Sequence, residues 1–140
     1  MRKDCFNTLG PGPRMGFEYP PIALVIGGTG FIGSHLVREL VRQGFRVRVL
    51  SRGAVPSTDG PTECIRGSLT DSNVLRDAIS GSSVVFHVAG GGGRSWEEFN
   101  HDVVLGTLNL ATACLRHGRP RLIYASSIAA LYLGLSLIHI

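Results

Sequence analysis

The order of apolar and polar residues changes near position 22, where strand-like and helix-like segments begin to alternate. The apolar run Ile22–Ile26 predicts a strand that is buried on both faces. A glycine-rich loop follows, and apolar side chains then recur at helical spacing until Gly44, a residue type that commonly ends helices. These helical positions are Ile32, Leu36, Val37, Leu40 and Val41. Residues 46–50 predict a second strand.

The same alternation continues along the rest of the chain. Asp71 can cap a short helix that runs through Ile79, and a longer helix is expected from Trp96 to Arg116. Further strands are expected at residues 63–66, 84–88 and 121–125. Strands and helices that alternate at this spacing form β-α-β units, whose right-handed crossovers produce a parallel sheet. We therefore predict an α/β fold with a doubly wound parallel sheet that is incomplete at its C-terminal end.

The pattern divides the 140 residues into three segments. Residues 1–20 are rich in glycine and proline without periodicity and are expected to form a flexible extension, in which Met15 is an alternative start. Residues 21–134 contain the alternating strands and helices and are expected to form part of one domain. Residues 135–140 match one reading frame of a widely used transposase sequencing adaptor. This tail is therefore expected to be non-native, which sequencing of intact genomic DNA would test.

Composition excludes several functional classes. The net charge of +4 comes from scattered arginines without interleaved aromatic residues, which favours a solvated basic surface over nucleic-acid binding. No apolar run is long enough to cross a membrane, and no signal peptide is evident. The three cysteines form neither a CxxC motif nor a Cys/His cluster, so no metal site is expected. These features favour a cytoplasmic protein with reduced cysteines.

The loop after the first strand carries the main candidate chemistry. Gly27, Gly30 and Gly33 satisfy G-x-x-G-x-x-G, and Gly28 begins an overlapping G-x-G-x-x-G. Glycine permits a tight turn and close approach of the backbone to a pyrophosphate, and the helix that follows offers free N–H groups. Because the loop joins a buried strand to an amphipathic helix, we predict a dinucleotide site of the Rossmann type.

The second strand indicates which dinucleotide is preferred. NAD-binding Rossmann folds usually end this strand in an acidic residue that accepts hydrogen bonds from the ribose hydroxyls. Here Ser51 takes that position and Arg52 follows it. A guanidinium suits a bidentate contact with a 2′-phosphate, so NADP is the expected cofactor and NAD the less favoured one.

Five segments carry recognisable motifs, at residues 25–36, 67–71, 85–89, 106–110 and 124–128. Taken in this order, they resemble the motifs of the extended short-chain dehydrogenase/reductases, also described as the NAD-dependent epimerase/dehydratase family. Residues 126–132 look most like the dihydroflavonol-reductase and cinnamoyl-CoA-reductase branch.

The resemblance implies a set of site residues. Ser127, or alternatively Ser126, would be the catalytic serine. Two positions depart from the family pattern: Ser68 replaces an aspartate that binds adenine, and Val103 replaces a common asparagine. His87 is expected to be a core histidine, and Asp102 to lie on the exposed side of its helix. The expected cofactor-binding residues are Gly27, Thr29, Gly30, Phe31, Ile32, Gly33, Ser51, Arg52, Ser68, Leu69, Val88, Ala89 and Gly90.

The resemblance also implies the reaction. Family members use a Tyr-x-x-x-Lys pair, but the only lysine here is Lys3, so the 140-residue chain is expected to lack turnover. The expected parent function is transfer of hydride between NADP(H) and a carbonyl or alcohol carbon of a small molecule. A nucleotide-sugar epimerase or dehydratase, and a non-catalytic NADP-sensing regulator, remain alternatives. Neither the substrate nor the oligomeric state follows from the sequence.

Overall fold

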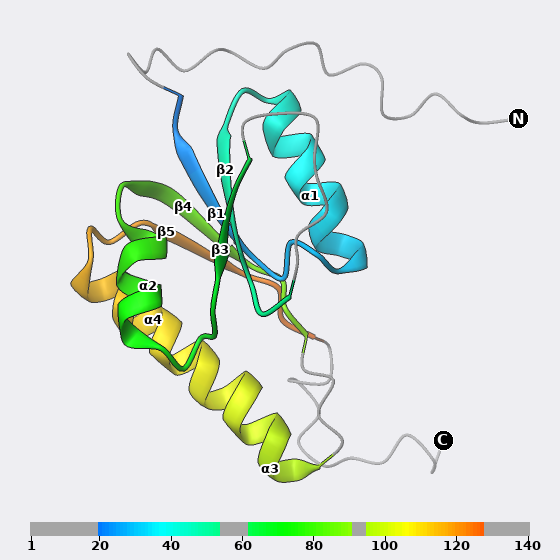
Figure 1. Ribbon diagram of the computed structural model, residues 1–140, viewed down its shortest axis with the longest axis vertical. Coiled ribbons are helices and arrows are strands. Elements are labelled where there is room, and N and C mark those ends of the chain that lie inside the picture. The colour runs from blue at the N-terminus through cyan, green and yellow to red at the C-terminus, as the bar shows by residue number, and fades with distance from the viewer. Residues whose placement is uncertain (1–19, 54–61, 91–94, 128–140) are drawn as a thin grey trace, which may run out of the picture.

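A computed structural model describes residues 20–53, 62–90 and 95–127 (Figure 1). The predicted helices and strands are all present, with ends shifted by at most two residues. The predicted flexible extension and non-native tail lie outside the described residues, except for Pro20. The elements in chain order are β1 (Ile22–Ile26), α1 (Phe31–Arg42), β2 (Arg46–Ser51), β3 (Thr62–Arg66), α2 (Ser72–Ile79), β4 (Ser82–His87), α3 (Trp96–Phe99), η1 (Asn100–Leu105), α4 (Gly106–Arg116) and β5 (Arg121–Tyr124).

The five strands form one parallel sheet in the order β3-β2-β1-β4-β5. The chain moves outward from β1 in one direction to β3 and then returns to add β4 on the other side of β1. Strand order therefore reverses between β1 and β4, as expected for a doubly wound fold. This confirms the predicted fold class.

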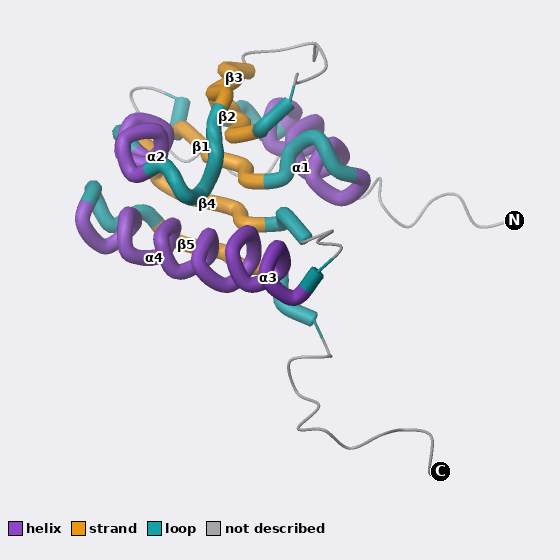
Figure 2. Tube along the Cα trace, turned by 60° about the horizontal axis from the view of Figure 1, so that its bottom comes forward, coloured by secondary structure: helices purple, strands orange, loops and turns teal. Residues whose placement is uncertain are grey.

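Alternate residues of the strands enter two separate hydrophobic cores. Leu24 and Ile26 of β1 face α2 and α4, whereas Ala23 and Val25 face α1. Figure 2 shows α1 on one side of the sheet and α2 with α4 on the other. A strand that is buried on both faces must be apolar throughout, which explains the uninterrupted run at β1.

Local signals fix the helix ends. Asp71 Oδ1 accepts hydrogen bonds from the backbone N–H groups of Asn73 at 2.9 Å and Val74 at 3.2 Å, as predicted for an N-cap. Gly44, which follows α1, has a φ of 87°, a conformation that costs little only for glycine. No helix among the described residues is long and apolar enough to cross a membrane.

One feature of the helical run after β4 was not predicted. The expected helix from Trp96 to Arg116 is present, but its central segment, η1, is a π-helix. A π segment contains more residues per turn than an α-helix, so it changes which side chains face the sheet. Asp102, described below, belongs to this segment.

Candidate dinucleotide site

The loops that follow β1, β2, β3 and β4 border one cleft of about 270 Å³. It lies at the carboxyl ends of the parallel strands, where strand order reverses and doubly wound folds bind ligands. Its lining residues are Ile26, Gly27, Thr29, Gly30, Leu50, Ser51, Arg52, Gly67, Ser68, Leu69, Thr70, His87, Val88, Ala89, Gly90, Asp102 and Val103.

The glycine loop is fixed by steric requirements. A β-carbon on Gly33 would lie 2.0 Å from the carbonyl oxygen of Gly27, so α1 can approach β1 only if this residue is glycine. Gly27 has a φ of 87°, and a β-carbon there would lie 2.7 Å from the backbone of Ala89. Gly28 packs in the same way against Val49. Each of the three glycines therefore permits a close approach, of Gly33 to Gly27, of Gly27 to Ala89 and of Gly28 to Val49.

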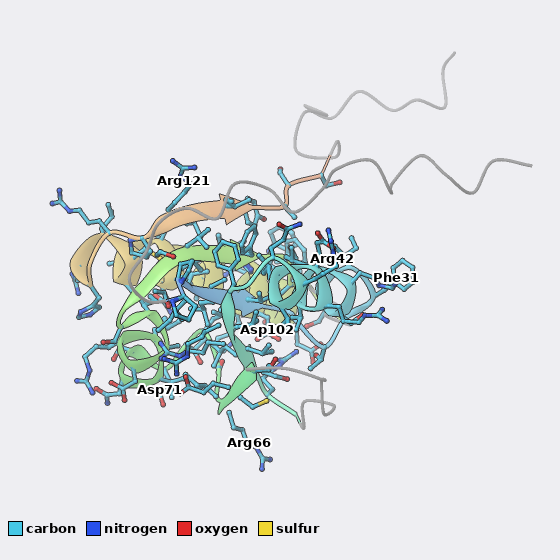
Figure 3. All side chains as sticks on the ribbon, turned by 90° about the horizontal axis from the view of Figure 1, so that it is seen from above. Phe31, Arg42, Arg66, Asp71, Asp102 and Arg121 are labelled. Atoms are coloured by element: carbon cyan, nitrogen blue, oxygen red, sulfur yellow. The ribbon has the colours of Figure 1, made fainter. Side chains whose placement is uncertain are left out.

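The N-terminus of α1 opens beside this loop. The N-cap residue is Gly30, which has no side chain to bond the first N–H groups of the helix. These groups, on Phe31, Ile32 and Gly33, have no carbonyl partner within the helix and carry its partial positive charge. The side chains of Phe31 and Ile32 are exposed and do not line the cleft, and Phe31 projects outward from α1 (Figure 3). Only their backbone could serve a ligand in the cleft.

An ion pair stands at the rim of the cleft beyond β2. Arg52 Nη1 lies 2.7 Å from Asp102 Oδ2, and the two side chains are 75% and 37% exposed. His101 Nδ1 lies 3.1 Å from the other oxygen, Asp102 Oδ1. Hydrogen bonds from His101 and Arg52 lower the pKa of Asp102, so the carboxylate is charged at neutral pH. Asp102 stays partly exposed, as expected from the sequence, but it also lines the cleft, which the sequence did not indicate.

The loop after β3 is held against α4. Asn109 Nδ2 donates a hydrogen bond to the carbonyl oxygen of Leu69 at 3.2 Å. Gly106 leaves space for the Leu69 side chain, which would lie 3.2 Å from a β-carbon at that position. Ser68 Oγ lies 3.0 Å from Thr70 Oγ1 and accepts a hydrogen bond from the Thr70 N–H at 3.2 Å. Ser68 therefore shapes the loop as well as lining the cleft.

His87 closes the base of the cleft at the end of β4. The residue is only 2% exposed, and its Nε2 lies 3.0 Å from Thr107 Oγ1. Its Nδ1 has no hydrogen-bond partner among the described residues. Burial lowers the pKa of the imidazole, so the ring is neutral near pH 7. His87 is buried as predicted, but it also lines the cleft, which the sequence did not indicate.

The structure gathers ten of the thirteen expected cofactor-binding residues at the cleft. Those that do not line it are Phe31, Ile32 and Gly33, all in the first turn of α1. The candidate catalytic serines, Ser126 and Ser127, follow β5, are exposed and are not among the lining residues. Lys3 lies outside the described residues. No group of three potential metal ligands occurs within residues 20–53, 62–90 and 95–127.

Sequence reasoning missed several lining residues. Val103 was named only as a departure from the family pattern, and Gly67 and Thr70 only as parts of a motif. Asp102 was missed because its partner is fifty residues away in the chain and the π segment leaves no clear sequence signal. The carboxylate at the cleft rim comes from η1 and not from the end of β2, where Ser51 lies.

Comparison with known proteins identifies the family to which the chain belongs. The sequence profile described as the NAD dependent epimerase/dehydratase family matches residues 23–133. A 2-alkyl-3-oxoalkanoate reductase of Stenotrophomonas maltophilia is 37% identical, covering 74% of this chain and 32% of the relative. A Synechocystis protein provisionally named dihydroflavonol 4-reductase is 35% identical, covering 76% of this chain and 33% of the relative. The chain thus spans about a third of the length of these relatives.

Solved structures agree with these matches. The structure titled MoeE5 in complex with UDP-glucuronic acid and NAD is 40% identical, with a TM-score of 0.68. The aligned region covers 75% of this chain and 36% of that chain. These findings confirm the resemblance that the sequence motifs predicted.

Proposed function

The chain belongs to the NAD-dependent epimerase/dehydratase family, and from this we propose that its cleft binds NADP(H) as the cofactor-binding portion of an oxidoreductase. The observation that carries the proposal is the flat glycine loop beside the uncapped N-terminus of α1. Together they offer a close-fitting backbone surface and free N–H groups, which suit a pyrophosphate. The parent enzyme would act on a carbonyl or alcohol carbon of a small molecule.

The residues around the cleft fit the two halves of a dinucleotide. Gly27, Gly30 and the N–H groups of Phe31, Ile32 and Gly33 would hold the pyrophosphate, with Thr29 beside them. Ser51 and Arg52 would contact the adenosine ribose and its 2′-phosphate, and Ser68 and Leu69 would border the adenine. Val88, Ala89 and Gly90 would lie along the nicotinamide half. The nicotinamide ring, when bound, supplies the position that accepts or donates hydride.

Ser127 would act on the substrate. It follows β5 at the carboxyl end of the sheet, where a hydroxyl could donate a hydrogen bond to the substrate carbonyl and stabilise charge that develops on its oxygen. Ser126, one residue closer to the strand, is the alternative. His87 would contribute no positive charge at neutral pH, since burial lowers the pKa of its imidazole.

The preference for NADP is tested by titrating the protein with NADP⁺ and NAD⁺ in a calorimeter. A charge-assisted hydrogen bond contributes about 1.5–3 kcal/mol, so the unsubstituted protein should prefer NADP⁺ by more than about tenfold. The double substitution Ser51→Asp/Arg52→Ala should abolish that preference while retaining affinity for NAD⁺. Equal affinities in the unsubstituted protein, or an unchanged preference in the double variant, would refute the assignment.

A nucleotide-sugar epimerase or dehydratase is a second candidate. The observation that favours it is the 40% identity to MoeE5, whose structure contains UDP-glucuronic acid and NAD. The two candidates are separated by assaying the protein encoded by the intact gene with small carbonyl compounds and with UDP-sugars. Net oxidation of NADPH by carbonyl compounds supports the reductase, whereas conversion of a UDP-sugar without NADPH consumption supports the second candidate.

A further inference from the structure

The rim of the cleft contains a carboxylate to which the proposed function assigns no role. Asp102 lines the cleft together with Ser51 and Arg52. It belongs to η1, and π segments within helices occur frequently at functional sites. In NAD-binding Rossmann folds the acid at this rim ends the second strand, where this chain has Ser51. A carboxylate therefore reaches the same rim from η1.

Two contacts hold that carboxylate in place. Arg52 lies 2.7 Å from Asp102 Oδ2, and His101 lies 3.1 Å from Asp102 Oδ1. The guanidinium proposed to bind a 2′-phosphate is therefore already paired with a negative charge. Because Arg52 is 75% exposed, this pair is weak and can be exchanged for another anion.

We propose that Asp102 is a cofactor-specificity residue whose carboxylate offsets the attraction of Arg52 for a 2′-phosphate and so limits the preference for NADP(H) over NAD(H). The inference rests on the proposed dinucleotide site and extends it. A 2′-phosphate must either displace Asp102 from Arg52 or share the guanidinium with it, and in both cases like charges lie close together. The 2′-hydroxyl of NAD(H) carries no charge and is not opposed in this way.

The test compares cofactor affinities of the Asp102→Asn variant with those of the unsubstituted protein. Asparagine is nearly the same size and removes only the charge, so affinity for NADP⁺ should rise about threefold to tenfold. Affinity for NAD⁺ should not rise, because its ribose adds no phosphate at this position. Asp102→Ser provides a second variant that should give the same direction of change.

Asp77→Asn is the matched control. Asp77 forms an exposed ion pair with Arg76 on α2, outside the cleft, so the substitution makes the same change in net charge. A thermal melt of each variant confirms that the fold is retained. If Asp77→Asn raises NADP⁺ affinity as much as Asp102→Asn does, the effect comes from net charge alone and the inference fails.

The remaining outcomes separate this inference from the proposed function. If the unsubstituted protein binds both dinucleotides and Asp102→Asn leaves their affinity ratio unchanged, only the role of Asp102 is refuted. If the unsubstituted protein binds NAD⁺ and NADP⁺ equally but Asp102→Asn then favours NADP⁺, the proposed preference fails and the role of Asp102 is supported. If neither dinucleotide binds, the site is refuted and the role of Asp102 with it.

Discussion

Two arginines in or next to β2 form ion pairs that differ in burial, since Arg48 is largely buried and Arg52 is exposed. Arg48 lies within β2, is 12% exposed, and donates from Nε to Glu63 Oε2 at 2.9 Å. Its Nη1 also donates to the carbonyl oxygens of Ala78 at 2.7 Å and Ser80 at 2.8 Å, at the C-terminal end of α2. Arg52 lies four residues later and is exposed. Among the described residues, its ion-pair partner is Asp102.

The difference shows how an arginine becomes structural or available to a ligand. Arg48 joins β2, β3 and α2 through several fixed acceptors, and its positive charge complements the C-terminal dipole of α2. Each bond restricts the side chain further, so no donor is easily released. Arg52 has a single exchangeable partner at the edge of a cleft. Burial and the number of acceptors, not residue type, separate the two roles.

The largest effect is expected when the structural arginine is removed. Arg48→Met keeps much of the apolar side chain but leaves the carbonyl groups of Ala78 and Ser80 without their donor. We expect a loss of about 2–4 kcal/mol in the free energy of unfolding, measured by urea denaturation. Arg46→Met is the control, since Arg46 is exposed in the same strand. A loss below that of the control would show that Arg48 does not hold these elements together.

The opposite result is expected for Arg52→Ala. Its affinity for NADP⁺ should fall about tenfold or more, because a charge-assisted contact with the 2′-phosphate is removed. Its free energy of unfolding should change by less than about 0.5 kcal/mol, as for most exposed substitutions. Calorimetric titration and urea denaturation of the same preparation measure both quantities. A large loss in the free energy of unfolding would show that Arg52 is structural, as Arg48 is, and would contradict the proposed difference between them.

The sequence predicted the elements of the fold far better than these roles. Apolar periodicity, the Asp71 cap and the glycines after α1 and in the loop are local signals, and each appears in the structure where it was expected. Arg48 and Arg52 look alike in the sequence because their acceptors lie in other elements. Arg52 contacts Asp102 of the unpredicted π segment across fifty residues of sequence, so only a three-dimensional structure brings them together. The assignments of Ser126 and Ser127 stay predictions.

His87 at the cleft is a buried group with one hydrogen-bond partner, Thr107, among the described residues. Burial lowers the pKa of its imidazole below the usual 6.5, so the folded state disfavours protonation. Above pH 6.5 the ring is neutral in both states, and the full stability is present. As pH falls from there toward the folded-state pKa, the unfolded state gains the proton first and stability decreases.

This pH dependence is measured by urea denaturation between pH 7.5 and pH 5, a range of about 2.5 pH units around the ordinary histidine pKa. One proton limits the slope to about 1.4 kcal/mol per pH unit. His87→Gln should flatten the profile, because it removes the buried imidazole. A profile with the same slope in His87→Gln would assign the dependence to other groups.

The smallest effect is expected at Glu63, the acidic partner of Arg48. Glu63 is 53% exposed, and Arg48 keeps its carbonyl acceptors when the carboxylate is neutralised. Glu63→Gln should therefore cost only about 0.5–1 kcal/mol in the free energy of unfolding, far less than Arg48→Met. Glu39→Gln is a matched control, because Glu39 forms an exposed pair with Arg42 within α1.

A double-mutant cycle then separates the Arg48–Glu63 pair from the other hydrogen bonds of Arg48. In the Arg48→Met background, Glu63→Gln should cause no measurable loss in the free energy of unfolding. If it costs the same in both backgrounds, Glu63 does not act through Arg48, and the carbonyl groups of α2 alone make Arg48 structural.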